Sequence, residues 1–267
     1  MPIAEIHRLK ELIDSQRDAV IVAHTNPDGD ALGSALAMAR FLQRKGIRAA
    51  VMVPNAFPGF LSWMPGIGEV LNWEDDAKDC AALTREAGMI FCMDFNALNR
   101  LDGLGTQVQS STAVKVLIDH HISPAAEFDL VFSETAVSST SELVYQLITS
   151  LGEQGLIDRE MAINLFVGIM TDTGSFSYAC GHPQTFHIAA DLVARGVDPE
   201  WVHRKVYDTY SEDRMRLLGF SLSERMKVLP ELHTAYIYLT LQDLEDFRFR
   251  IGDTEGLVNY PLSIDGI

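Results

Sequence analysis

The sequence predicts an α/β fold: a parallel sheet with flanking helices, then a helical connector and a smaller carboxy-terminal α/β domain. Short apolar runs rich in Val and Ile alternate with segments of helical periodicity, which is the pattern of repeated βαβ units. Hydrophobic residues make up 47% of the 267 residues, enough to build a sizeable core. We place the three parts at residues 1–197, 198–229 and 230–267.

The individual elements follow from the apolar spacing along the chain. Residues 3–17 carry apolar side chains at helical intervals, whereas residues 19–23 form a short apolar run typical of a buried strand. A helix and a second strand complete the first βαβ unit, and residues 54–74, rich in Pro, Gly and Trp, predict a loop with one short helix. Helices are predicted at residues 3–17, 30–45, 75–87, 140–151, 158–170, 184–194 and 199–227. Strands are predicted at residues 19–23, 48–53, 89–94, 114–119, 130–133 and 233–241.

Charge and cysteine content narrow the class of protein. The formal net charge of −16 gives no general attraction for a polyanion, so long duplex DNA is not expected as a partner. Three scattered cysteines without CxxC spacing are typical of a reducing compartment. The amino terminus lacks a signal-peptide pattern, and no apolar run approaches the roughly 20 residues that span a bilayer. We expect a cytoplasmic protein with no membrane partner. Its oligomeric state stays open, with a homodimer as one candidate.

Chemically active side chains recur where the predicted strands end. His24 follows the first strand, Asp94 ends the third, and Asp119 ends the fourth. The carboxyl ends of parallel strands meet at one edge of a sheet, where ligands bind, so we expect these side chains to converge. The full set of candidates is His24, Asp28, Asp30, Asp94, Asp119, His120, His121 and Asp172.

This set of imidazoles and carboxylates, with no thiol among them, favours Mn²⁺, with Mg²⁺ or Co²⁺ as alternatives. The candidates are too many for one ion, so we expect a cluster of two, of the kind that assists in-line displacement at phosphorus. Each residue also has an ordinary interpretation: Asp94 or Asp30 as a helix N-cap, Asp28 in a turn, the adjacent histidines as chance neighbours. All of these would have to hold together at one sheet edge, so we prefer the metal cluster.

Four segments in order match the motifs of a known family: residues 24–34 (HTNPDGDALGS), Asp94, residues 119–121 (DHH) and residues 171–174 (TDTG). With these motifs the chain resembles the DHH phosphoesterase family over about residues 1–195. Segments 138–145, 172–178 and 184–196 are similar to its branch of oligoribonucleases (nanoRNases) and phosphatases of 3′-phosphoadenosine 5′-phosphate (pAp). In that branch the DHH domain precedes a DHHA1 substrate-binding domain.

The resemblance implies a role for each candidate. One Mn²⁺ would be held by His24, Asp28 and Asp94, and a second by Asp30, Asp94, His120 and Asp172. Asp119 would orient a ligand histidine, and His121 would contact the substrate phosphate or protonate the leaving oxygen. The implied activity is Mn²⁺-dependent hydrolysis of short oligoribonucleotides, of pAp, or of both.

Substrate contacts are predicted for two further pairs of residues. Ser138 and Ser139 precede a helix, where hydroxyl groups either cap the helix or bind a phosphate. Phe176 and Tyr178, with Tyr260 as a further candidate, would offer an aromatic shelf to a base, the alternative being that they are core residues.

Two other functions stay open at this point. An inorganic pyrophosphatase or exopolyphosphatase shares the first motifs, so metal chemistry does not separate it from the first interpretation. A non-catalytic nucleotide-binding regulatory module is disfavoured because no motif ligand is missing. The chain departs from the branch at Ser177, a position that is often basic, and lacks the glycine-rich motif of the second domain before Ile267. We therefore expect either that the second domain is incomplete or that the substrate is bound differently.

Overall fold

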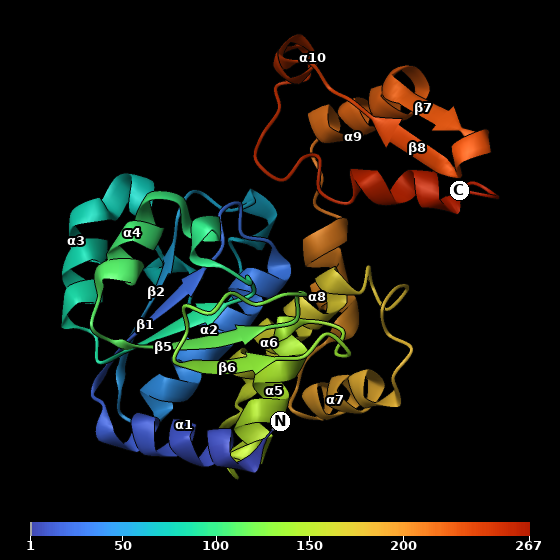
Figure 1. Cartoon of the computed structure of the whole chain (residues 1–267). Coiled ribbons are helices and arrows are strands. Elements are labelled where there is room, and N and C mark those ends of the chain that lie inside the picture. Colours follow the sequence, from blue (N-terminus) through green and yellow to red (C-terminus); the bar gives the residue numbers. More distant parts are fainter. Residues whose placement is uncertain (1) are drawn as a thin grey trace. The chain divides into compact units, whose positions relative to one another are not determined.

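The computed structural model describes residues 2–267, which form two compact units. The first unit runs up to Ala56 and resumes from Ser62 to His203, and the second combines Phe57–Leu61 with Arg204–Ile267. Figure 1 shows a parallel sheet with its helices in the first unit and a small two-stranded sheet in the second. Within the described residues, every helix is too short or too polar to cross a lipid bilayer.

A six-stranded parallel sheet with the strand order β3-β2-β1-β4-β5-β6 organises the first unit. Its strands are β1 (Asp18–Ala23), β2 (Arg48–Val53), β3 (Leu71–Asn72), β4 (Met89–Met93), β5 (Val114–Asp119) and β6 (Leu130–Ser133). The strand order reverses between β1 and β4, which is where open α/β sheets bind their ligands. Ala23 pairs with Met93, and Met93 pairs with Ile118. The residues that follow these three, His24, Asp94 and Asp119, therefore lie at one level.

Helices cover both faces of this sheet (Figure 1). The helices of this part of the chain are α1 (Ile3–Ser15), α2 (Gly29–Arg44), α3 (Trp73–Glu86), α4 (Asp102–Ser110), α5 (Thr140–Ser150), α6 (Arg159–Asp172), α7 (Pro183–Ala194) and α8 (Pro199–Tyr207), which the unit boundary divides after His203. On one face, Val20 and Val22 of β1 pack with Leu104 and Val108 of α4. On the other, α2 packs on β1 and β2, and α5 packs on β5. Helix α6 is buried from Met161 to Met170 because it packs among α2, α5 and α7.

Glycine permits the close approach of α2 and α6. A Cβ added to Gly33 would lie 2.5 Å from the carbonyl oxygen of Asn164 and 3.1 Å from the backbone nitrogen of Gly168. Both neighbours are backbone atoms, which cannot swing aside as a side chain can. The two helices therefore depend on a residue without a side chain at this contact, and the contact brings the amino-terminal turn of α2 beside the carboxy-terminal half of α6.

The second unit is built on an antiparallel pair of strands, β7 (Met226–Leu229) and β8 (Thr234–Ile237). Helices α9 (Glu212–Phe220) and α10 (Leu241–Asp246) accompany them, with a π-helical turn, η5 (Ser221–Arg225), and 3₁₀ helices η6 (Pro230–Leu232) and η7 (Leu257–Ser263). The Arg225 guanidinium donates two hydrogen bonds, of 2.9 and 2.6 Å, to the carboxylate of Asp243. Asp243 also completes a capping box with Thr240, so one buried carboxylate ties the start of α10 to the end of η5.

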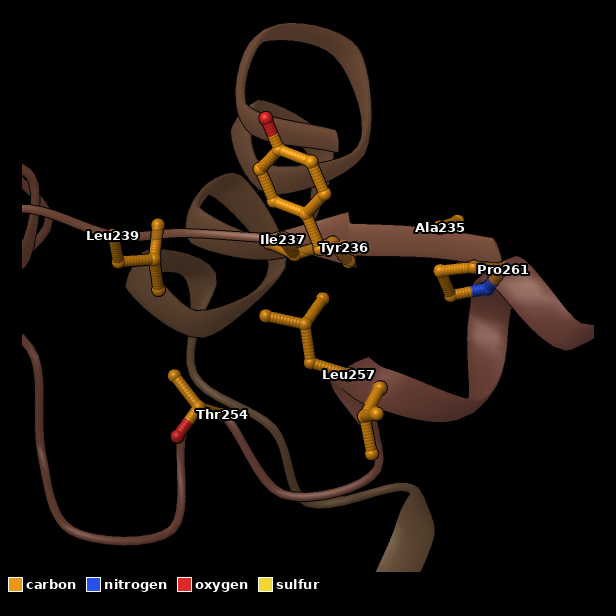
Figure 2. Close-up of a pocket in the computed structure, with 8 residues that line it drawn as sticks. Ala235, Tyr236, Ile237, Leu239, Thr254, Leu257 and Pro261 are labelled. Atoms are coloured by element: carbon orange, nitrogen blue, oxygen red, sulfur yellow. The ribbon is translucent and has the colours of Figure 1, made fainter. Parts of the chain in front are cut away.

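An apolar cavity of about 260 Å³ lies between β8 and η7 in this second unit (Figure 2). Side chains that line it include Ile237 of β8 and Leu257 and Pro261 of η7. Leu257 is buried, whereas Val258 beside it is 74% exposed. The small unit therefore has a thin apolar centre beside exposed apolar side chains.

The predicted α/β class with a parallel sheet is confirmed, and the five strands predicted between residues 19 and 133 are present. The loop over residues 54–74 contains two short 3₁₀ helices, η1 (Gly59–Leu61) and η2 (Ile67–Glu69), and the two-residue strand β3, where one helix was predicted. Two more 3₁₀ helices, η3 (Leu98–Leu101) and η4 (Gln154–Leu156), and helix α4 were not predicted.

The segment predicted to be helical over residues 199–227 is helical in three pieces up to Arg225, and the prediction is wrong for Met226 and Lys227, which belong to β7. Helix α8 ends at Tyr207, and Ser211 caps a new helix by accepting a hydrogen bond from the backbone N–H of Arg214. Residues 226–229 form β7 because they pair with β8, and Leu229 precedes Pro230, whose ring disfavours helical backbone in the residue before it.

Candidate metal centre

Three groups of side chains at the carboxyl edge of the sheet have ligand atoms close enough to hold a metal ion. In each group these atoms lie within 4.8 Å of one another. The groups are His24, Asp28 and Asp94; Asp30, His120 and Asp172; and Asp94, His120 and His121. The register of β1, β4 and β5 accounts for this convergence, because it puts His24, Asp94 and Asp119 at one level, and His120 comes directly after Asp119. The structure thus brings together every residue that the sequence predicted as a ligand.

Asp94 lies at the centre of the cluster. It is only 2% exposed and has a φ of 64°, a left-handed conformation that few residues other than glycine adopt. Its Oδ2 lies 3.6 Å from Nε2 of His24, and its Oδ1 lies 3.6 Å from Nε2 of His120. Oδ2 therefore faces the group of His24, and Oδ1 faces the group of His120. A carboxylate that bridges two ions has this arrangement.

The first group is held by the turn that follows β1. Nδ1 of His24 donates to the carbonyl oxygen of Thr25 at 2.7 Å, because a carbonyl can only accept. That bond directs the lone pair of Nε2 toward Asp94 when the ring is neutral. Asp28 is the N-cap of α2, and its Oδ1 accepts from the backbone N–H groups of Asp30 and Ala31, both at 3.0 Å. The helix cap therefore fixes the Asp28 carboxylate beside His24.

The second group is assembled from two helix ends and a strand end. Asp30 lies in the first turn of α2, Asp172 ends α6, and His120 follows β5. Nε2 of His120 lies 3.5 Å from Oδ2 of Asp172. The two oxygens of Asp30 accept the backbone N–H groups of Thr140, at 2.6 Å, and Ser141, at 2.8 Å, which begin α5. The amino terminus of α5 thus stabilises the negative charge of Asp30 inside the protein.

His121 is oriented by Asp119. Its Nδ1 donates to Oδ1 of Asp119 at 2.7 Å, and Asp119 is fully buried. This bond occupies Nδ1, although the same atom lies 3.9 Å from Oδ1 of Asp94. The side chain of His121 is 47% exposed, so its Nε2 is the nitrogen left for a substrate. The predicted orienting function of Asp119 therefore has a concrete partner, which is His121 rather than His120.

The crowding of carboxylates shifts their pKa values. Burial, and next the charge of Asp94, raise the pKa values of Asp28 and Asp30, and the same causes raise that of Asp172 to about 7. Burial acts in the same sense on Asp94, yet its pairing with His24 lowers its pKa. Burial opposes the change at His24, but Asp94 and the charge of Asp28 raise its pKa to about 9. The cluster carries more negative charge than its own histidines neutralise, so bound cations would stabilise it.

The donor set fits divalent metal ions. Two of these groups together supply four carboxylates and two imidazoles. The cysteines of the described chain belong to none of the groups, and Cys80 and Cys92 are buried in the core on the α3–α4 face. Oxygen and imidazole donors suit Mn²⁺, Mg²⁺ and Co²⁺, whereas thiolates would have favoured zinc.

The predicted substrate residues lie in two kinds of environment. Ser139 is the N-cap of α5, where its hydroxyl accepts from the N–H of Glu142, and the hydroxyl of Ser138 donates to the Glu142 carboxylate at 2.6 Å. The capping interpretation is therefore confirmed for Ser139. Phe176 packs between Phe166 and Phe186, with ring centroids 5.7 and 5.8 Å away. The four predicted residues are Ser138, Ser139, Phe176 and Tyr178, of which Tyr178 is 48% exposed and both serines are buried.

Sequence reasoning did not identify Thr140 as part of this centre. Besides its N–H bond to Asp30, its hydroxyl donates to Oδ1 of Asp94 at 2.8 Å. The run of Ser and Thr before the helix was noticed, but it signals a local helix cap and does not reveal partners that are 46 and 110 residues away along the chain.

Comparison with known proteins places this site in a family. Residues 18–169 match the family model described as "DHH family, N-terminal domain". The chain belongs to the DHH family. The resemblance drawn from the motifs is thereby confirmed, and the matched range contains every candidate ligand of this DHH chain except Asp172, three residues beyond its end.

Several relatives of this DHH chain have named activities. It is 25% identical over 252 residues to the bifunctional oligoribonuclease and PAP phosphatase NrnA of Bacillus subtilis, covering 94% of this chain and 75% of that protein. It is 29% identical over 177 residues to the protein of that name from Thermus thermophilus, covering 66% of this chain. The chain spans about half the length of several of the curated relatives it matches, 50% for the Thermus protein.

A solved structure shares the whole fold. The crystal structure of an exopolyphosphatase-related protein from Bacteroides fragilis is 41% identical in sequence and superposes with a TM-score of 0.94. The match covers 100% of this chain and 78% of that one. The fold described above is therefore that of an experimentally determined relative.

Proposed function

We propose that this DHH chain is a metal-dependent phosphoesterase that hydrolyses short oligoribonucleotides, pAp, or both. The observation that carries the proposal is the convergence of two ligand groups on the two oxygens of Asp94. Paired divalent cations bridged in this way promote in-line displacement at phosphorus. The proposed substrates are those in the names of the Bacillus and Thermus relatives.

The proposed site takes two divalent cations, Mn²⁺ by preference and Mg²⁺ or Co²⁺ as alternatives. One would be held by His24, Asp28 and Asp94, and the other by Asp30, Asp94, His120 and Asp172. When bound, the ions would offset the negative charge of the phosphate and of the leaving oxygen. The raised pKa values of the surrounding carboxyls support this role, because they report excess negative charge that cations would relieve.

In this proposal His121 serves as a proton donor or phosphate contact. Its bond to Asp119 fixes the ring and leaves Nε2 for the substrate. Burial opposes the charged ring, but that bond, the largest effect, raises the pKa of His121, so the imidazole holds a proton more readily at neutral pH. A protonated Nε2 could pass its proton to the leaving oxygen of the substrate.

Recognition of a base is proposed for Phe176 and Tyr178, which follow Asp172 by a few residues. Three consecutive residues, Gly174 to Phe176, have positive φ values of 53°, 59° and 62°, so the chain turns sharply just after the ligand. We leave Ser138 and Ser139 out of the proposed contacts, because both hydroxyl groups already bond within the first turn of α5.

The proposal includes a cytoplasmic location and leaves room for a homodimer. The free cysteines fit a reducing compartment. The net charge of −16 disfavours long duplex DNA, whereas a short substrate could bind through the metal ions.

The substrate class is tested by parallel assays on the Mn²⁺-loaded protein with pAp, a 5′-labelled ribotrinucleotide, pyrophosphate and polyphosphate. We expect phosphate from pAp or mononucleotides from the trinucleotide, with little release from the two inorganic substrates. Exclusive turnover of pyrophosphate or polyphosphate would instead support the pyrophosphatase or exopolyphosphatase alternative. Binding of pAp without any turnover would support a regulatory module.

The metal-dependent part is tested with Asp94→Asn. Asparagine accepts the left-handed backbone that Asp94 adopts, so the variant removes the charge and one acceptor while keeping the turn. We expect it to lose Mn²⁺ binding and nearly all turnover. His121→Asn is the matched variant: it should bind Mn²⁺ normally but lose about 10²–10⁴-fold in kcat. An Asp94→Asn protein that binds two ions and turns over normally would overturn the assignment.

A further inference from the structure

The first turn of α5 connects two carboxylates of the candidate metal centre through one residue. Thr140 is fully buried and is the first residue of the helix. Its backbone N–H donates to Oδ2 of Asp30 at 2.6 Å, and its hydroxyl donates to Oδ1 of Asp94 at 2.8 Å. The direction of the second bond is certain because Asp94 is ionised at neutral pH and a carboxylate can only accept.

The hydroxyl of Thr140 is not needed to cap α5. Ser139 performs that function, with its side chain accepting from the N–H of Glu142 at 3.0 Å. A threonine inside a helix usually bonds the carbonyl oxygen one turn earlier, but the first helical residue has no such carbonyl within its helix. The hydroxyl donates instead to Asp94, which lies 46 positions earlier and directly follows β4.

The bond restricts the one soft rotation of Asp94. The terminal torsion of an aspartate is broad, so an unrestrained carboxylate turns easily about its Cβ–Cγ bond. With Oδ1 held by Thr140, that oxygen stays on the side of His120, and Oδ2 stays on the side of His24. The two oxygens are thus assigned to the two ligand groups before any ion binds.

Close packing behind Asp30 keeps Thr140 in place. A Cβ on Gly168 of α6 would collide with the hydroxyl of Ser141 and lie 2.6 Å from Oδ1 of Asp30. Space for a side chain is therefore absent at the point where α2, α5 and α6 meet. The backbone of α5 cannot shift there without disturbing Asp30, so the position of Thr140 is set by three helices.

We infer that Thr140 is a positioning residue of this centre, which sets the orientation of Asp94 and through it the binding of the second metal ion. The inference rests on the proposed metal-dependent function. Oδ1 faces the group of Asp30, His120 and Asp172, so loss of the hydroxyl should weaken that ion more than the ion at His24 and Asp28. Loss of an outer partner of a metal ligand typically costs 10–100-fold in affinity.

The test compares Thr140→Val, which keeps the shape and the backbone N–H, with Thr140→Ser, which keeps the hydroxyl. Mn²⁺ alone is titrated into each metal-free protein by calorimetry, and bound Mn²⁺ is followed by electron paramagnetic resonance, which detects coupling between two nearby ions. Wild type and Thr140→Ser should bind two coupled ions. Thr140→Val should bind one ion normally and the other about 10–100-fold more weakly, without the coupled spectrum.

Thr140→Ala is a second variant without the hydroxyl, in case valine disturbs the fold, and thermal unfolding of the metal-free variants checks the fold itself. The inference would be overturned if Thr140→Val or Thr140→Ala bound two Mn²⁺ ions as tightly as the wild type does. It would also be overturned if Thr140→Ser, which keeps the hydroxyl, failed to bind the second ion. These readouts use no substrate. If the wild-type protein binds two ions but hydrolyses none of the substrates, the proposed activity fails while the position of Thr140 is still decided by the titration.

Discussion

The metal-free protein should lose stability as the pH rises from 5 to 7. Burial and the charges of Asp94 and Asp28 raise the pKa of Asp172 from 3.8 to about 7. Between these values the folded protein holds a proton that the unfolded chain has released, so raising the pH favours unfolding. His24 acts in the same direction at higher pH: the stability it contributes is complete below about 6.5 and is lost as the pH rises through about 9.

The size of the effect follows from the same pKa values. One proton held only by the folded state changes the free energy of unfolding by about 1.4 kcal/mol per pH unit. Asp172 is close to fully protonated at pH 5 and half protonated at pH 7, so the loss over this range is about 2 kcal/mol. For a chain of this size that corresponds to a fall in Tm of roughly 4–8 °C. Asp94 adds no slope here, because its lowered pKa keeps it ionised throughout.

The measurement is the Tm of the metal-free protein at pH 5, 6 and 7, by circular dichroism after treatment with a chelator. Asp172→Asn is the control, because an amide does not titrate, and it should reduce the slope and leave the part that comes from Asp28 and Asp30, whose pKa values are also raised. Saturating Mn²⁺ should reverse the trend, since ligands bind metal only when deprotonated, and an ion at 100 times its Kd adds about 2.7 kcal/mol. A Tm that rises between pH 5 and 7 without metal, or an unchanged slope in Asp172→Asn, would refute the reasoning.

Two further predictions concern the scaffold. Gly33→Ala should destabilise the protein by about 1–3 kcal/mol in urea unfolding, because its Cβ would meet backbone atoms of Asn164 and Gly168. Gly155→Ala, whose Cβ would meet open space, is the control, and equal stability of the two variants would contradict the packing argument. Asp158→Ala should cost about 1–2 kcal/mol at pH 7, because Asp158 caps α6 and accepts hydrogen bonds from Arg40 and Arg44. Burial opposes ionisation, yet these bonds lower the pKa of Asp158 to about 2. The stabilising effect of Asp158 is therefore complete above about pH 4 and should be lost as the pH falls through about 2. An Asp158→Ala protein as stable as the wild type at pH 7 would contradict this prediction.

The ligand positions at the strand ends were predictable from the sequence. Each apolar run is long enough to be a buried strand, and His24, Asp94 and His120 each directly follow one. A parallel sheet aligns such ends without further information. Asp172 was harder, because it ends a helix, and its position depends on how α6 packs against α2. It was singled out because it follows a very apolar helix and precedes Gly174, and the family motif that contains it agreed.

Contacts between distant segments could not be predicted from the sequence. The Ser138–Glu142 segment predicts a capped helix, since each local rule concerns residues within one turn. That Thr140 also holds Asp30 and Asp94 depends on the packing of three helices. Strand β7 was mistaken for helix for a similar reason, because only its pairing with β8 makes residues 226–229 extended. Local periodicity is weak in so short and charged a segment.

The strand order has a consequence for synthesis on the ribosome. β1 is made first and lies inside the sheet, β2 and β3 add successively on one side of it, and β4, β5 and β6 add successively on the other. Every new strand thus finds an edge that already exists, and none has to be inserted between two others. The ligand set is completed last, when Asp172 emerges after the final strand of this sheet. At about 5–20 residues per second, on the order of ten seconds pass between the synthesis of Asp28 and Asp30 and that of Asp172. Until then the nascent chain carries these repelling carboxylates without Asp172, and α5, whose backbone N–H groups bind Asp30 in the folded protein, is made before α6.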